Sequence, residues 1–149
     1  MLDVSTAELD RLLRFGWRRF GPAYFRPGCV GCRACVSLRV PVAEFEPSKQ
    51  QRRVARKASF LRLRVAAPMV DEQRIQLYRR WHDSQGDKRG WASDRIEAQE
   101  YFHQFAFPHP AAREFSYWDE RQEGVSKLVG VAIVDETPSA LSAVYTFYD

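Results

Sequence analysis

The stretch LVGVAIVDETPSALSAVYTFYD spans residues 128–149 and decides the fold. Two runs rich in β-branched and aromatic residues flank the turn residues Thr137-Pro138-Ser139, a pattern typical of a β-hairpin. Upstream, Glu114–Asp119 reads as another strand, and a turn at Glu123-Gly124 separates it from the strand Lys127–Asp135. Because consecutive strands with short turns form meanders, this part of the chain is predicted to be an antiparallel sheet.

Helical segments precede these strands, so the predicted fold class is α+β. Residues 71–81 carry apolar side chains at helical spacing, and residues 83–90 are predicted to form a polar loop. Ser93 or Asp94 is expected to cap a further helix, which Pro108 and Pro110 terminate.

In the first part of the chain, segments predicted to be helices or strands alternate with a segment predicted to be irregular. Capping-box patterns at Ser5 and Ser48 predict helices over about residues 6–15 and from residue 48 through Lys57. Residues 17–35 show no period and are expected to be irregular. Alternating apolar residues over 36–42 predict an edge or bulged strand because of Pro41, and residues 61–65 predict a strand with a basic face.

Composition and charge exclude several classes of protein. The 149 residues include 45% hydrophobic and 28% charged residues, which excludes global disorder, collagen and coiled coil. The longest apolar run, Leu128–Val134, is too short for a membrane span, and no secretory signal is expected at the N-terminus. Residues 1–70 carry 14 Lys/Arg and 5 Asp/Glu, whereas residues 71–149 carry 9 and 14. This asymmetry predicts a polyanionic partner for the first half.

Three cysteines form the sharpest local motif, Cys29-x-x-Cys32-x-x-Cys35. Thiolates select zinc, iron–sulfur clusters or copper(I), so this spacing predicts metal or cluster binding. A zinc site or a cluster requires a fourth ligand, which His82, His103 or His109 could supply only from far along the chain. Buried cysteines without a ligand are the alternative.

The stretch 47–70 contains seven Lys/Arg and no acidic residue. Arg52, Arg53 and Arg56 share one face of the predicted helix, and upstream aromatics alternate with Arg18 and Arg19. Arginine with aromatics suits phosphate contact and base stacking, so the pattern favours unpaired RNA as the partner. A solvated helix face is the alternative interpretation.

These motifs together resemble the aminoacyl-tRNA–protein transferases, which comprise arginyl-tRNA–protein transferases and bacterial aspartate/glutamate leucyltransferases. The resemblance rests on Gly16-Trp17-Arg18-Arg19, on Tyr24-x-x-Pro27 with the three cysteines, on residues 36–53, and on the blocks 128–135 and 141–149. The family normally continues beyond the Tyr-Asp that ends this chain. The chain is therefore similar to a family member without its C-terminal part.

The resemblance implies transfer of arginine or leucine from aminoacyl-tRNA to the N-terminal amine of an acceptor protein, often one with an acidic first residue. It implies that this tags the acceptor for degradation in the cytoplasm. It also implies a metal- or cluster- and tRNA-binding region over residues 1–67, with Arg18, Arg19, Arg39, Arg52, Arg53 and Arg56 as tRNA-binding candidates. An N-acetyltransferase-like domain would begin at residue 68.

Candidate catalytic residues lie in the matched C-terminal blocks. Asp135 could accept a proton or orient the amine, and Ser142 or Tyr145 could donate a hydrogen bond to the oxyanion. Strict alternation along a strand, however, puts Ser142 and Tyr145 on opposite faces. The alternative function is a non-catalytic RNA-binding or metal- or redox-sensing module.

Overall fold

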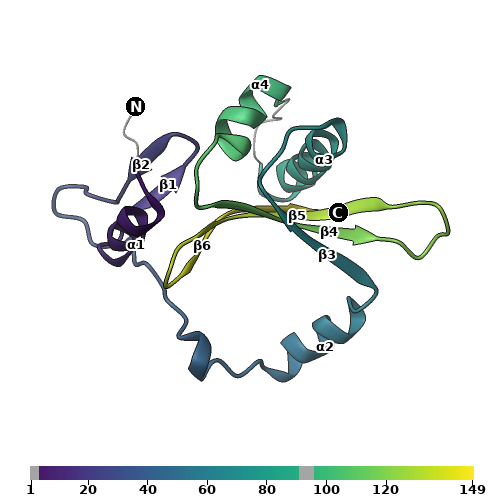
Figure 1. Ribbon diagram of the computed structural model, residues 1–149, viewed down its shortest axis with the longest axis horizontal. Coiled ribbons are helices and arrows are strands. Elements are labelled where there is room, and N and C mark those ends of the chain that lie inside the picture. The colour runs from purple at the N-terminus through teal and green to yellow at the C-terminus, as the bar shows by residue number, and fades with distance from the viewer. Residues whose placement is uncertain (1–3, 91–95) are drawn as a thin grey trace.

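In the computed structural model, which describes residues 4–90 and 96–149, a four-stranded antiparallel sheet organises the chain (Figure 1). Its strands are β3 (Leu61–Ala66), β4 (Ala112–Asp119), β5 (Lys127–Glu136) and β6 (Leu141–Tyr148), in that spatial order. The predicted meander and the α+β class are confirmed. The strand β3 is one edge of the sheet and β6 is the other.

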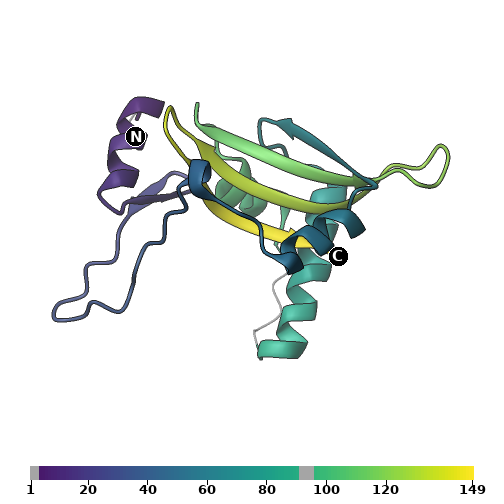
Figure 2. The ribbon, with the colours of Figure 1, turned by 90° about the horizontal axis from the view of Figure 1, so that it is seen from below.

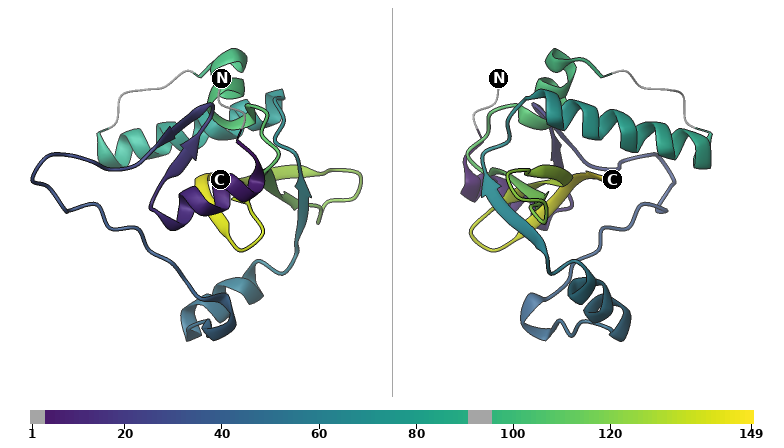
Figure 3. Two further views of the ribbon diagram at one scale, coloured as in Figure 1. Left: turned by 60° about the vertical axis from the view of Figure 1, so that its left-hand side comes forward. Right: turned by 90° about the vertical axis from the view of Figure 1, so that its right-hand side faces the viewer.

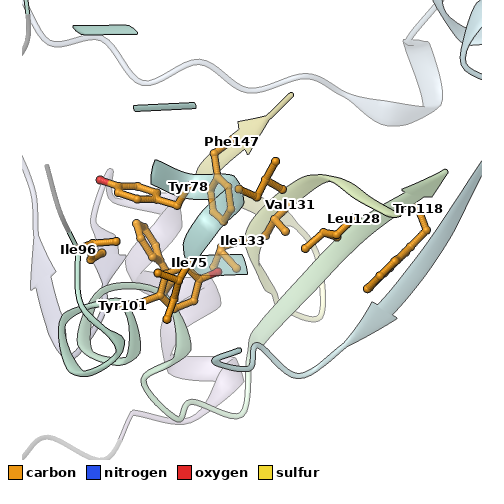
Figure 4. Close-up of a cluster of buried hydrophobic side chains, with 11 residues drawn as sticks. Ile75, Tyr78, Ile96, Tyr101, Trp118, Leu128, Val131, Ile133 and Phe147 are labelled. Carbon is orange, nitrogen blue, oxygen red and sulfur yellow. The ribbon is translucent and has the colours of Figure 1, made fainter. Parts of the chain in front are cut away.

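Two helical segments cover one face of this sheet (Figure 1). They are α3 (Glu72–Arg89) and α4 (Ala98–Tyr101), and α4 continues into a π-helical turn over Phe102–Ala106. Figure 4 shows the core between helices and sheet, where Tyr78 and Tyr101 pack against Ile133 and Phe147. Burial of these large side chains supplies the main hydrophobic stabilisation of this unit.

Helix α3 is longer than the sequence predicted. The polar segment 83–90 was expected to be a loop, but the helix continues through it to Arg89. Gln85 is buried there, and Gly90 ends the helix with a left-handed φ of 69°. The prediction was wrong because apolar spacing marks only the packed part of a helix, while the solvated end has no such signal. The predicted caps Ser93 and Asp94 lie outside the described residues.

The N-terminal unit consists of helix α1 (Thr6–Arg14) and a small hairpin, β1 (Arg18–Phe20) with β2 (Ala23–Phe25). The capping box between Ser5 and Glu8 is present as predicted. The hairpin corrects the expectation of an irregular segment. It turns at Gly21, whose φ is 53°, and a Cβ there would lie 2.1 Å from the carbonyl oxygen of His103. This close backbone approach requires glycine.

The strap, residues 26–60, joins the N-terminal unit to β3 as a wide arc on the side of the sheet away from α3 (Figures 1 and 2). It contains a 3-10 turn, Val42–Glu44, and helix α2 (Lys49–Lys57) with the predicted capping box of Ser48 and Gln51. The strand expected over residues 36–42 is absent. Its apolar side chains are exposed, no neighbouring strand offers hydrogen bonds, and Pro41 lacks a donor.

The second face of the sheet is open. Leu63, Val65, Tyr117 and Tyr148 all point to this face by strand register and are exposed. The predicted domain boundary near residue 67 falls just after β3, which already belongs to the four-stranded sheet. In the described part of the chain, no helix combines the length and apolar character needed to cross a membrane.

Candidate functional site

A groove lies where three segments meet: helix α1, the strap near residues 38–42, and the start of β6. Its volume is about 990 Å³, and we call it the α1–β6 groove. Residues that line it include Arg14, Arg18, Leu38, Arg39, Val40 and Ser142. Figure 3 (left) shows helix α1 in front of the turn between β5 and β6, which it contacts through Asp10 and Thr137. Three of the residues predicted from the sequence, Arg18, Arg39 and Ser142, are thus brought together.

Asp10 joins α1 to the β5–β6 turn at the groove. Its Oδ1 accepts hydrogen bonds from the hydroxyls of Thr137 (2.7 Å) and Ser139 (2.6 Å) and from the backbone amide of Ser139 (3.1 Å). Its Oδ2 accepts from the guanidinium of Arg14 at 2.9 Å. These bonds, led by those of Ser139 and Thr137, hold the pKa of Asp10 well below its usual range.

Arg19 and Asp135 form a buried ion pair, and Asp135 is the cross-strand neighbour of Ser142, which lines the groove. The guanidinium Nε and Nη2 of Arg19 bind Asp135 Oδ1 at 2.9 and 2.5 Å, and Nη1 donates to the carbonyl of Gly21. Both side chains are almost completely buried. Arg19, expected to bind tRNA, is therefore turned inward in this structure. Asp135, expected to accept a proton, holds the hairpin β1–β2 against the sheet.

A β-bulge changes the predicted relation between Ser142 and Tyr145. The β5–β6 register shifts between Ile133 and Val134, so that Ser142 pairs with Asp135 and Tyr145 pairs with Ile133. Ile133 and Asp135 lie two residues apart on one strand and share a face. Ser142 and Tyr145 therefore lie on the same face as Asp135, and the expectation of opposite faces is wrong. The extra residue of a bulge resets alternation and leaves no clear mark in the sequence.

The surroundings of Ser142 and Tyr145 nevertheless differ. Tyr145 packs into the aromatic cluster, with its ring centroid 5.0 Å from that of Phe105 and 5.7 Å from that of Trp81. Ser142 is half-buried and lines the groove. Of the three predicted catalytic residues, Ser142 alone lines the groove.

The three arginines of α2 lie away from the groove. Arg52, Arg53 and Arg56 are exposed on a helix that has no buried residue. No ion pair joins them to a carboxylate within residues 4–90 and 96–149. Their charges are exposed to solvent, and binding of a polyanion by them stays a prediction.

The three cysteines are exposed in the strap and form no disulfide. A turn brings the amide of Cys32 to 3.2 Å from the carbonyl of Cys29. Within the described residues, no group of three or more His, Cys, Asp or Glu side chains is arranged to hold a metal ion. The thiols as placed do not form a complete site, and zinc or cluster binding stays a prediction.

Arg14 lines the groove and was not singled out from the sequence. The signal that could have found it is its spacing of four residues from Asp10, which places both side chains on one face of α1. Its bond to the hydroxyl of Ser139, at 3.2 Å, joins residues 125 positions apart and could not be predicted from local pattern.

The fold and the groove define a class of protein: an α+β chain in which a basic N-terminal region and an antiparallel sheet form one site. Comparison identifies the family. The family model described as "Arginine-tRNA-protein transferase, N terminus" matches residues 2–53, and its counterpart for the C terminus matches residues 73–149. The chain belongs to this arginine-tRNA-protein transferase family.

Curated relatives agree with this assignment. Proteins named aspartate/glutamate leucyltransferase are 39% identical in Halorhodospira halophila and 34% identical in Helicobacter hepaticus, each over 148 residues. A relative of the same name from Stenotrophomonas maltophilia is 35% identical over 153 residues. These matches cover 99–100% of this chain but only 59–61% of the relatives. The chain thus spans about 60% of the length of these relatives.

Proposed function

We propose that this protein acts in the transfer of leucine or arginine from aminoacyl-tRNA to the N-terminal amine of an acceptor protein. The observation that carries the proposal is that residues from both family-matched regions line the groove. Helix α1 and the strap residues 38–42 that line the groove belong to the first match, whereas β6, which carries Ser142, belongs to the second. The relatives' name indicates aspartate or glutamate as the acceptor residue.

In this proposal the exposed arginines of α2 bind the tRNA. Arg52, Arg53 and Arg56 form a positive surface without carboxylate partners in the described chain. Guanidinium groups bind phosphates in two-point contacts, which suits attachment of an RNA backbone. The tRNA would be held on the strap while its aminoacyl end reaches the groove.

The reaction is attack of an amine on the ester that links the amino acid to tRNA. A terminal amine has a pKa of about 8, so part of it is already neutral near neutral pH. The protein then mainly positions the two substrates and stabilises the oxyanion. Ser142 is the candidate hydrogen-bond donor to that oxyanion. The Arg19–Asp135 pair helps to hold Ser142 in place, since Asp135 is the cross-strand neighbour of Ser142.

The test is transfer of labelled leucine or arginine from charged tRNA to a peptide with N-terminal Asp. We expect transfer by the chain. Ser142→Ala should lower the rate about 10- to 100-fold, which is at or below the lower end of the range of about 100- to 1,000-fold for loss of one oxyanion donor. The matched control is Ser126→Ala, which removes a hydroxyl from the exposed β4–β5 connection far along the sheet. Binding of tRNA with no transfer would contradict the proposal and favour a non-catalytic RNA-binding module.

We propose further that the transferred residue marks the acceptor for degradation, as the resemblance implies. The supporting observation is the family assignment, and the corresponding test is the half-life of an Asp-initiated reporter in cells with and without the gene. A half-life that is the same in both strains would contradict this part of the proposal.

A further inference from the structure

Two arginines of the α1–β6 groove lack acidic partners within the described residues. Arg18 donates to the carbonyl of Trp17 at 2.8 Å, and Arg39 donates to the carbonyl of Leu13 at 2.8 Å. Arg14, in contrast, is paired with Asp10. The groove therefore presents two guanidinium groups whose charge is not neutralised, which makes it a site for an anion.

The lining of the groove favours a peptide over RNA. None of the residues that line it is aromatic, so unpaired bases have no side chain on which to stack. Its walls include the apolar side chains of Leu38, Val40 and Leu141. The carboxylate of Glu136 also lines the groove, but it is paired with Arg113 at 2.9 Å and therefore does not cancel the charges of Arg18 and Arg39.

The free edge of β6 adds a second recognition element. Strand β6 pairs with β5 on one side, and no described strand pairs with its other side. The amide of Thr137 donates to the carbonyl of Ala140, and the amide of Asp149 donates to the carbonyl of Val129. These two bonds set which residues of β6 direct their backbone groups towards β5. By ladder alternation, Leu141 and Ala143 direct their amides and carbonyls away from β5, and both line the groove. An extended peptide can add to such an edge through main-chain hydrogen bonds.

We infer that the α1–β6 groove holds the N-terminal residue of the acceptor protein, with Arg18 and Arg39 binding its side-chain carboxylate. This inference rests on the proposed function, in which the acceptor begins with Asp or Glu. It assigns Arg18 and Arg39 to acceptor specificity, whereas the sequence had suggested tRNA. The peptide backbone lies along Leu141–Ala143, beside the hydroxyl of Ser142.

The experiment compares two fluorescent peptides that differ only in an N-terminal Asp or Asn. We expect the 149-residue chain to bind the Asp peptide at least tenfold more tightly, as charge-assisted hydrogen bonds allow. Arg18→Gln and Arg39→Gln should each reduce this ratio severalfold. Arg53→Gln on α2 is the matched control, with the same change of charge, and should leave the ratio unchanged while weakening tRNA binding. Circular dichroism checks that each variant is folded.

Equal affinity for the two peptides would overturn the inference, and so would a ratio that survives in both groove variants. A ratio that falls in Arg53→Gln would place the site on α2 instead. Loss of tRNA binding in Arg18→Gln with an unchanged peptide ratio would show that the groove binds RNA. The transfer assay is scored separately: transfer without Asp/Asn discrimination would refute the groove assignment alone, whereas discrimination without transfer would refute the proposed function alone.

Discussion

At the scale of single residues, Asp10 connects the first helix to the last hairpin. Its two oxygens accept bonds from Thr137, Ser139 and Arg14, which hold its pKa far below the ordinary value of about 3.9. A depressed pKa in the folded state stabilises the fold above the unfolded pKa, and that contribution is lost as pH falls below about 4. We expect Asp10→Asn to lower the melting temperature at pH 7 and to match the wild type increasingly closely towards pH 2. A constant difference across this range would contradict the expectation.

The Arg19–Asp135 pair gives a second prediction at this scale. Asp135→Asn keeps the side-chain shape but leaves the Arg19 charge buried without a counter-charge, which costs about 3–5 kcal/mol in comparable sites. Urea unfolding measures the change. The double variant Arg19→Met/Asp135→Leu should lose less than the sum of the two single variants. A cost below about 1 kcal/mol for Asp135→Asn, well short of the buried-pair range, would mean that the pair is solvated.

At the residue scale, Asp135 and Arg19 could be predicted as functional candidates from the sequence, but their contact with each other could not. The two lie 116 residues apart, and motif matching gave each a role in chemistry or tRNA contact. What brings them together is the docking of the hairpin β1–β2, which local pattern does not encode. Ser142 was identified correctly as a strand residue, yet its face depended on a bulge that alternation could not predict.

At the scale of elements, helix α2 could be predicted from the sequence, but the fact that it packs against no other element could not. The capping box located its start, but capping does not report whether a helix packs on anything. Because α2 buries no residue, its surface charges can be reversed without harm to the fold. We expect Arg52→Glu/Arg53→Glu to leave the melting temperature unchanged, to weaken tRNA binding, and to flatten the logarithmic salt dependence by about 0.7–0.9 for each phosphate that is no longer bound. The control is Arg62→Glu on strand β3, and an unchanged salt slope for the α2 variant would contradict RNA binding there.

The cysteine segment of the strap gives a separate prediction. If the thiols close around a metal, purified protein should contain about one zinc or one cluster's iron per chain, and Cys29→Ser/Cys32→Ser/Cys35→Ser should contain none. Unfolding of the sheet should be the same in both proteins, since all three cysteines lie in the exposed strap. Elemental analysis by mass spectrometry measures the metal. Wild-type protein without zinc or iron would contradict metal binding.

At the scale of the whole molecule, the N-terminal unit is docked on one end of the sheet. The strap joins this unit to β3 along the open face of the sheet (Figure 1). The sheet could be predicted because its strands follow one another with short turns. The docking could not, because its contacts join residues more than a hundred positions apart. The apolar alternation over residues 36–42 predicted a strand that is not formed, for the same reason: a strand is stable only where a partner strand lies beside it.

This arrangement predicts that the molecule survives cleavage of its strap. Residues 25–57 are all exposed, so trypsin should cut first at sites such as Arg33 and Arg39. The N-terminal fragment should nevertheless remain bound, because Leu9 and Leu13 pack against Ala111 and because the Asp10 and Arg19 contacts cross to β5 and the β5–β6 turn. We expect both fragments to elute together in size-exclusion chromatography and to separate only on denaturing gels. The double variant Asp10→Ala/Arg19→Gln should release the N-terminal fragment after the same digestion. Release from the wild-type protein would show that the strap, and not the docked contacts, holds the two ends of the groove together.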